Sequence, residues 1–168
     1  MTNSWKRPKL KIPKTMTESI LDIIGYSSYL GSTLFLLIIW SRLPEKVPVH
    51  YNVLGKVDRW GSKWELFILS GVGAFMILLM QTLEKYPEAH NYPQRLNESN
   101  AEQFYTNSRK LVNQLKNFCL ILLAFTLFES IFIALGLANG FGKWLLPLTI
   151  IGIGGSMLLA IIRQRKIK

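Results

Sequence analysis

The chain has 168 residues, of which 49% are hydrophobic and 18% are charged, and its formal net charge at pH 7 is +10. A strongly basic balance is common in nucleic-acid-binding proteins. Here, however, the Lys and Arg residues are divided among segments that flank long apolar runs. We therefore exclude nucleic acid as the expected partner and expect these basic residues to contact the lipid bilayer through its anionic headgroups.

Four long apolar runs are expected to form membrane-spanning helices, at about residues 20–40, 66–83, 117–138 and 144–163. Each has about 18 residues or more, which is enough to cross a hydrocarbon core of roughly 30 Å. Backbone polar groups in lipid must pair within their own segment, and runs of this length do so as helices. The sequence therefore predicts an all-α integral membrane protein with one four-span domain over residues 1–168.

The basic residues also predict the orientation of the four spans. Fourteen of the twenty Lys and Arg residues lie on the same side as the N-terminus, within 6–14, 85–116 and 163–168. The other six, including Lys143, lie between spans one and two or between spans three and four. The positive-inside rule then places both termini in the cytoplasm. We expect a multi-pass protein of the cell membrane, with the first loop, residues 43–64, facing outward.

This first loop is expected to be a short ordered cap. Alternation with a period of two over 47–54 predicts an extended segment. One face would press Val and Tyr side chains toward the bilayer or the helix tops, and the other would present His50 and Asn52 together. Gly55 permits a turn, and residues 58–61 are expected to form a second bend.

His50 and Asp58 leave three interpretations open. Imidazole and carboxylate groups are metal ligands, and Glu45 or Glu65 would complete a metal site, although no spacing requires one. Alternatively, the pair has a structural hydrogen-bonding role, or it serves ligand binding or acid–base chemistry. No catalytic motif is found in the sequence, so nothing argues for an enzyme or for a cofactor other than such a metal.

The segment between the second and third spans is expected in the cytoplasm. Apolar residues recur near helical spacing from residue 101 onward and are accompanied by Arg109, Lys110 and Lys116. This pattern predicts an amphipathic helix at the inner membrane surface that continues into the third span. Such a helix would anchor the span or dock a cytoplasmic regulator.

Glu129 is the single acid within the third apolar run. An acid near the middle of a span costs on the order of 3 kcal/mol, so it usually faces the bundle interior or water. Two roles remain open for it. It would pair through hydrogen bonds with Ser130, Thr126 or another helix, or it would serve as the ion or substrate site of a small transporter.

Small residues in the second and fourth spans predict close helix packing. The second span contains Gly71 and Gly73, and the fourth contains Gly152, Gly154 and Gly155. Such residues let helix backbones approach closely in lipid. The contacts are expected either within the bundle or between the protomers of a homo-oligomer.

Two stretches of the sequence resemble a known family. The first is Leu43-Pro44…Pro48-Val-His50-Tyr-Asn52…Gly55-Lys-Val-Asp58…Trp60-Gly61-Ser-Lys63, and the second is His90-Asn91-Tyr92-Pro93 followed by 97–105 and 109–116. Together they cover about a third of the chain. They are similar to the bacterial membrane family of the domain of unknown function number 1648.

The resemblance implies a protein that binds or senses a ligand. The best-understood relative is the immunity protein that protects sporulating bacilli from their secreted sporulation-delay toxin and captures a cytoplasmic repressor at the membrane. A similar role would let the first loop recognise an extracellular peptide, ion or envelope component. Its candidate ligand-binding or structural residues are Pro48, His50, Asn52, Gly55, Asp58, Trp60, Gly61 and Lys63. The alternatives are a transporter that uses Glu129 and a membrane enzyme or metal site at His50 and Asp58.

Overall fold

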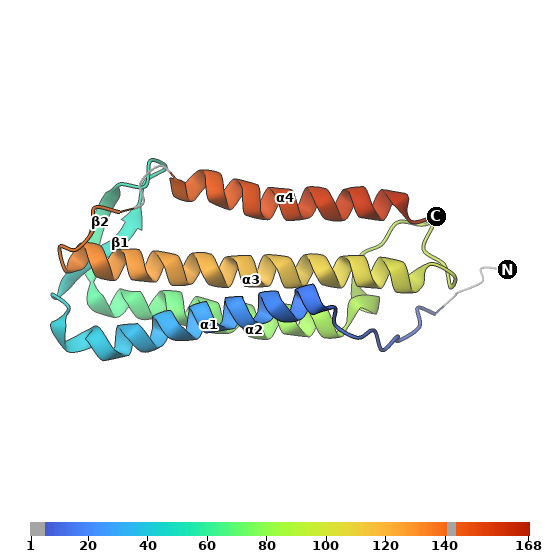
Figure 1. The fold of residues 1–168 in the computed structure, drawn as a ribbon, viewed down its shortest axis with the longest axis horizontal. Coiled ribbons are helices and arrows are strands. Elements are labelled where there is room, and N and C mark those ends of the chain that lie inside the picture. Colours follow the sequence, from blue (N-terminus) through green and yellow to red (C-terminus); the bar gives the residue numbers. More distant parts are fainter. Residues whose placement is uncertain (1–5, 141–143) are drawn as a thin grey trace.

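The computed structural model describes residues 6–140 and 144–168, so Lys143 lies outside the described residues. Within these ranges four long helices run side by side along one axis (Figure 1). They are α1 (Met16–Ile39), α2 (Leu66–Lys85), α3 (Ala101–Ala134) and α4 (Leu145–Lys166). All four are long and apolar enough to cross a membrane, which confirms a mainly helical chain and supports a multi-pass membrane protein.

The bundle has two chemically different ends. We call one the terminal end, because residues 6–15, the C-terminus and the segment 86–100 lie there (Figure 1). The other, the hairpin end, carries the connection between α1 and α2.

Local signals set some of the helix boundaries. Thr15 caps α1 by accepting a hydrogen bond from the N–H of Glu18, and Gly136, with φ of 71°, ends α3 in a left-handed turn.

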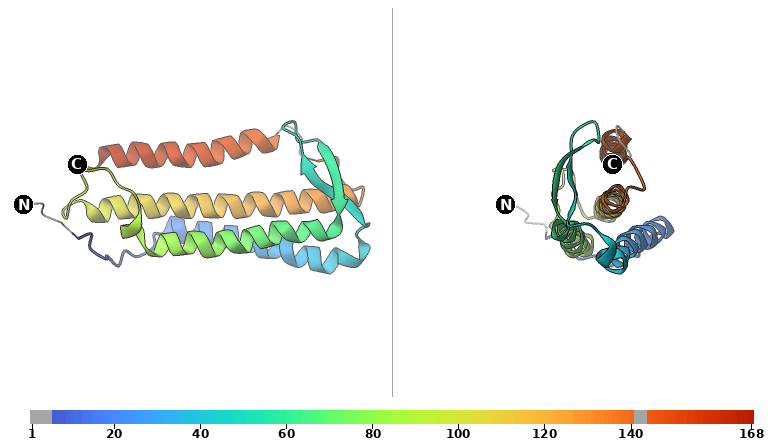
Figure 2. Two further views of the ribbon diagram at one scale, coloured as in Figure 1. Left: turned by 180° about the vertical axis from the view of Figure 1, so that it is seen from behind. Right: turned by 90° about the vertical axis from the view of Figure 1, so that its left-hand side faces the viewer.

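α3 is the central element and packs against each of the other three helices (Figure 2). Its 34 residues extend over about 51 Å at 1.5 Å per residue, which exceeds the roughly 30 Å of hydrocarbon in a bilayer. The expected continuity of this helix with the third span is therefore found. Its polar half does not lie free on a membrane surface, however, because Arg109 and Lys116 are buried among the ends of the neighbouring elements.

The connection between α1 and α2 contains two strands, so the prediction of an all-α chain is wrong in this segment. Strands β1 (Lys46–Tyr51) and β2 (Val57–Ser62) form an antiparallel hairpin. The expected bend at 58–61 is part of β2, and Pro48 lies opposite Trp60 in the register. Apolar residues alternate along the chain with a period of two only in β1. In β2, charged residues and Gly61 stand where this alternation would require apolar side chains.

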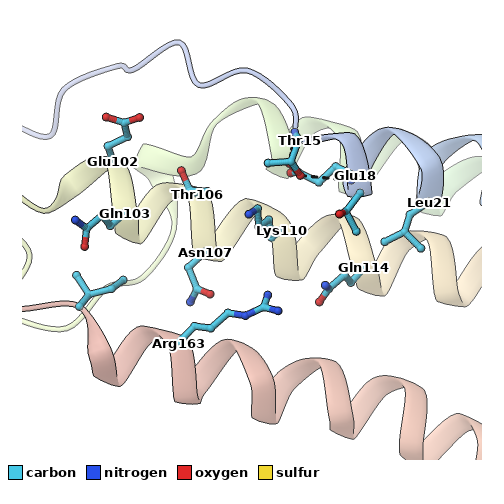
Figure 3. A pocket seen from close by; sticks show the side chains of 12 residues that line it. Thr15, Glu18, Leu21, Glu102, Gln103, Thr106, Asn107, Lys110, Gln114 and Arg163 are labelled. Carbon is cyan, nitrogen blue, oxygen red and sulfur yellow. Dashed lines mark hydrogen bonds between the residues drawn. The ribbon is translucent and has the colours of Figure 1, made fainter.

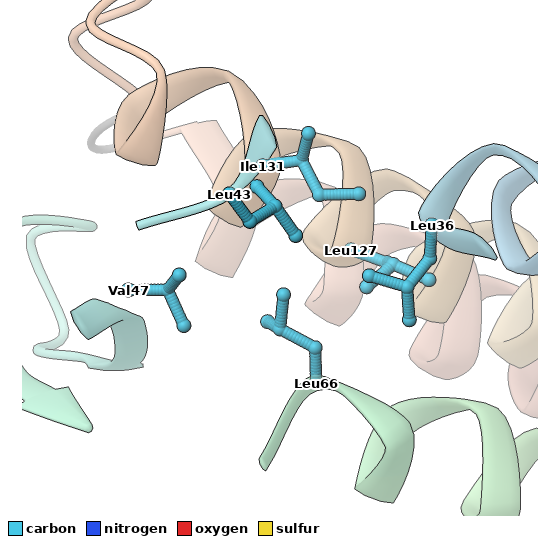
Figure 4. Close-up of a cluster of buried hydrophobic side chains, with 6 residues drawn as sticks. All are labelled: Leu36, Leu43, Val47, Leu66, Leu127 and Ile131. Atoms are coloured by element: carbon cyan, nitrogen blue, oxygen red, sulfur yellow. The ribbon is translucent and has the colours of Figure 1, made fainter. Parts of the chain in front are cut away.

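A compact apolar cluster fixes this hairpin to the helices (Figure 4). Val47 of β1 is fully buried between the ends of three helices and the chain that leads into the hairpin. Because Val47 points inward, β1 lies flat against the helix ends rather than extending away from them. The members of the cluster are Leu36, Leu43, Val47, Leu66, Leu127 and Ile131.

α4 is the least embedded helix. Its main contact is with α3, and in the end-on view it stands apart from α1 and α2 (Figure 2). Phe118 of α3 lies directly over Gly152, where a Cβ atom would come within 2.0 Å of the Phe118 ring. Gly152 therefore permits a close approach of the two helices.

We expect a Gly152→Val substitution to weaken the packing of α4 on α3 by about 1–3 kcal/mol, the usual cost of forcing extra volume into a packed contact. Thermal unfolding in detergent, followed by circular dichroism, would measure the loss. Gly154→Val is the matched control, because a Cβ there meets no atom within 4 Å. Equal melting temperatures for the two variants would contradict this account of the helix contact.

Candidate functional site

The hairpin cap, residues 43–65, is ordered mainly by its own polar contacts. The Asn52 side-chain carbonyl oxygen accepts hydrogen bonds from the backbone N–H groups of Leu54 at 2.9 Å and Lys56 at 3.1 Å. Gly55 adopts φ of 69°, which L-residues with side chains rarely adopt. Asn52 is therefore occupied in closing the turn and does not join His50 on a common binding face.

His50 and Asp58 bind each other across the hairpin. The distance from His50 Nδ1 to Asp58 Oδ1 is 2.5 Å, and the side chains are 63% and 40% exposed. Glu45 pairs with Lys63 and Glu65 with Arg59, each at 3.0 Å. Within residues 6–140 and 144–168, no three His, Cys, Asp or Glu side chains gather as a metal site would require. The geometry thus favours the structural hydrogen-bonding role for this pair.

A glycine is needed at position 61 because the Glu65 carboxylate folds back over it. Glu65 accepts a hydrogen bond from the Ser62 backbone N–H at 3.0 Å and one from Arg59 at 3.0 Å. A Cβ atom at residue 61 would lie 2.1 Å from Glu65 Oε1 and 2.8 Å from Val49 Cγ2. The absence of a side chain at this position therefore allows the strand, the ion pair and the start of α2 to meet.

We expect Gly61→Val to loosen the cap while leaving the helices intact. The substituted side chain would displace Glu65 from Arg59 and Ser62, at a cost of about 1–3 kcal/mol. Limited proteolysis of protein in detergent would report this as faster cleavage within 52–57. Gly31→Val is the control, since a Cβ there meets nothing within 4 Å; similar cleavage rates for both variants would rule out the close approach at Gly61.

A small cavity lies beneath the hairpin. It has a volume of about 220 Å³ and is bounded by β1, β2, α2 and α3. Its apolar wall includes Val49, Leu66 and Leu69, and Arg59 and Glu65 provide charges within the same lining. Its volume falls below the usual range for drug-sized ligands. The cavity therefore suits one side chain of a larger ligand or a small molecule.

Glu129 lies beside this cap. It is 2% exposed and sits within the last two turns of α3, near the hairpin end. Its neighbour Ser130 hydrogen-bonds with the hydroxyl of Tyr51 at 2.8 Å. Burial raises the pKa of Tyr51 to about 12, and the nearby Glu129 charge acts in the same direction. The structure therefore places this acid near the cap rather than at the middle of its helix.

The second family stretch, His90-Asn91-Tyr92-Pro93, folds against the start of α3 at the terminal end. His90 contacts the Ser108 hydroxyl and lies 3.0 Å from the Leu83 carbonyl oxygen. The Tyr92 ring lies against Phe104, Tyr105 and the Arg7 guanidinium. Asn91 and Pro93 are exposed. This stretch positions the return of the chain into α3 and is remote from the hairpin cap.

A buried set of charges at the terminal end has no counterpart among the predicted site residues. We call it the charge cluster, and its first part is centred on Arg109. The guanidinium binds both carboxylate oxygens of Glu18, at 2.9 and 3.0 Å. It also donates to the backbone carbonyls of Ile12 at 2.5 Å and Pro13 at 2.9 Å. Arg109 thereby holds the N-terminal segment, α1 and α3 together.

The second part of the charge cluster is centred on Lys116, which is fully buried. Its ammonium lies 2.9 Å from Asp22 and 2.6 Å from Glu84. Lys14 of the N-terminal segment approaches the same two carboxylates at 2.5 and 3.0 Å. Three cations thus face three acids, so the cluster is neutral overall. It comprises Lys14, Glu18, Asp22, Glu84, Arg109 and Lys116.

Comparisons with known proteins support the family resemblance. Residues 29–74 match the family described as "Domain of unknown function (DUF1648)". The chain is also 34% identical over 87 residues to an uncharacterised protein of Archaeoglobus fulgidus, covering 51% of this chain and 46% of that relative. The chain therefore spans under half the length of this relative, and the similarity extends to an archaeon.

No solved structure matches the chain. The matched region contains the second half of α1, the whole hairpin cap and the first half of α2. It therefore includes β1 with His50 and β2 with Asp58 and Gly61, whereas α3 and α4 lie outside it. Across residues 29–74, the chain is therefore similar to the family of the domain of unknown function DUF1648.

Proposed function

We propose that this protein is a sensor in the cell membrane, with the hairpin cap recognising an extracellular ligand. The supporting observation is that α3 contacts both ends of the bundle. Near one end Ser130 binds Tyr51 of the cap, and in its other half Arg109 and Lys116 hold the N-terminal segment and the neighbouring helices. Rigid secondary elements can carry coupling between distant sites. Movement of the cap would therefore change the contacts around the charge cluster.

An outward-facing cap follows from the distribution of charge. The larger share of the Lys and Arg residues lies toward the terminal end, which the positive-inside rule assigns to the cytoplasm. Single cysteines at Val53, in the hairpin turn, and at Glu98, in the segment 86–100, would test this in a Cys119→Ser background. Labelling of whole cells by an impermeant maleimide at 53 but not at 98 is expected. The reverse pattern would place the cap in the cytoplasm.

The chemistry of the cap favours a peptide as the ligand. The cavity of about 220 Å³ has an apolar wall large enough for one side chain. The Arg59–Glu65 pair in its lining supplies a cation and an acid that can bind the polar backbone or a charged group of the same peptide. Resistance to a toxic peptide, the role that the family resemblance implies, would be one use of such a site.

Blocking the cavity tests this proposal. A deletion strain is expected to become at least several-fold more sensitive to one or more members of a panel of membrane-active peptides. The wild-type gene should restore resistance, whereas Ile68→Trp, which adds volume at the edge of the cavity, should not. Leu78→Trp, also on the exposed surface of α2, is the matched control and should restore resistance. Unchanged sensitivity of the deletion strain, or equal rescue by both variants, would count against peptide recognition.

Transport through Glu129 is the second candidate function, since an acid that is 2% exposed within an apolar helix is costly unless it has a use. This function predicts proton- or sodium-driven flux in proteoliposomes and its loss in Glu129→Gln. The Tyr51→Phe variant, which alters the neighbouring hydroxyl without removing the acid, should retain flux. Absence of flux with protons, sodium or cationic drugs would remove this candidate.

A further inference from the structure

One feature that the proposed function leaves unused is a cavity at the terminal end that is lined mainly by polar and charged residues (Figure 3). It has a volume of about 410 Å³ and lies between the start of α1, the first half of α3 and the end of α4. Asn107, Gln114 and Arg163 converge there from two helices (Figure 3). The amide nitrogen of Asn107 donates to the Ala160 carbonyl at 2.9 Å, which holds α4 at the edge of the cavity.

Two cations in the lining are available for a ligand. In the part of the chain that the structure describes, neither Lys110 nor Arg163 forms an ion pair. Two acids also contribute to the lining, but Glu18 is already bound by Arg109. Glu102 is exposed in the first turn of α3. The uncommitted charge of the cavity is therefore positive, and amide and hydroxyl donors surround it.

The depth of the cavity matches the headgroup layer of a bilayer. Lys110 precedes the apolar part of α3, which starts near residue 117, by seven residues, or about 10 Å of helix. Arg163 directly follows the apolar run of α4. Both cations thus lie just beyond the hydrocarbon, where a lipid phosphate would be found. α4 stands apart from α1 in the end-on view (Figure 2), and its side chains Leu158 and Leu159, five and four residues before Arg163, are exposed and apolar.

We propose that this cavity binds one anionic phospholipid, with the phosphate between Lys110 and Arg163 and the acyl chains along the apolar surface of α4. Basic pockets between membrane helices are suited to such headgroups. The ligand would fill the space between α1 and α4 that α3 alone does not close. The site lies at the opposite end of the bundle from the hairpin cap.

Native mass spectrometry of the full chain would test this, with phosphatidylglycerol as the probe and phosphatidylcholine and phosphatidylethanolamine as the zwitterionic comparisons. We expect one tightly retained phosphatidylglycerol per chain and about 30-fold weaker binding in Lys110→Gln/Arg163→Gln, on the basis of the two charges removed. Arg165→Gln/Lys166→Gln is the matched control: it removes two positive charges at the same end of the bundle, outside the cavity lining. Its affinity should change by less than about threefold.

Equal losses in the two double variants would show non-specific attraction to a basic surface and would overturn the proposal. Equal retention of all three lipids by the wild-type protein would do the same. A photoactivatable phosphatidylglycerol in nanodiscs gives a second measurement that does not depend on a substitution. It should label peptides within 102–114 and 160–168, and labelling confined to other segments would place the lipid elsewhere.

Discussion

Replacing Arg109 with methionine is expected to be among the most damaging single changes in this protein. The guanidinium is 4% exposed and binds Glu18 through two atoms and the carbonyls of Ile12 and Pro13. Removal of one partner from a buried ion pair leaves an uncompensated charge and typically costs about 3–5 kcal/mol. Unfolding in mixed detergent micelles should show a loss of this size, and the N-terminal segment should become accessible to proteases.

A double variant separates the stability that is lost with the charge from the stability that is lost with side-chain packing. Glu18→Gln combined with Arg109→Met removes both charges, and a glutamine can still reach back to Thr15 in the helix cap. We expect this double variant to recover a substantial part of the stability lost by Arg109→Met alone. Arg165→Met, an exposed change at the same end, should be nearly neutral. If Arg109→Met were equally neutral, the buried ion pair would contribute nothing to the fold.

Lys116→Met is expected to destabilise the protein by about 3 kcal/mol. Its ammonium is fully buried between Asp22 and Glu84. Without it, these two acids would keep their ion pairs with Lys14 and their hydrogen bonds from Asn113 and Asn117. The Lys14 side chain is 42% exposed, so water screens its interaction more strongly. We therefore place the expected cost at the lower end of the range for buried pairs.

A double-mutant cycle would measure this interaction directly. Asp22→Asn keeps the shape of the side chain while removing its charge, so Lys116→Met/Asp22→Asn should lose less stability than the sum of the single changes. Coupling energies for residues in one charged network are commonly about 0.5–3 kcal/mol. Additive losses in the cycle would mean that Lys116 stabilises the bundle through Glu84, the Tyr26 ring or its aliphatic chain rather than through Asp22.

Parts of the cap that depend on local sequence were predictable, and parts that depend on pairing were not. The alternation over 47–54 correctly indicated an extended strand, and Gly55 correctly indicated the turn. β2 was missed because a strand can be recruited by hydrogen bonding to its neighbour without a clear pattern of its own. The Ser62-x-x-Glu65 capping box is a local signal for the start of the second helical segment.

The charge cluster shows where sequence reasoning reaches its limit. Arg109, Lys110 and Lys116 are equivalent as basic residues of one polar helix, yet the first and last are buried in ion pairs while Lys110 is not. Their difference arises from which face of α3 meets α1 and α2. The Thr15-x-x-Glu18 capping box marks the start of α1, but it does not reveal that Glu18 also binds a side chain 91 residues away.

The sequence by itself indicated four helices long and apolar enough to cross a membrane, because uninterrupted apolar runs must satisfy their backbone groups internally in lipid. It also determined that an ordered motif separates the first two of them. Only the tertiary structure decided that α3 is the central helix, that the motif folds as a hairpin against its end, and that the charges of Arg109 and Lys116 lie inside the bundle. These outcomes depend on contacts between residues far apart in the chain, whereas helix formation in lipid depends on each segment alone.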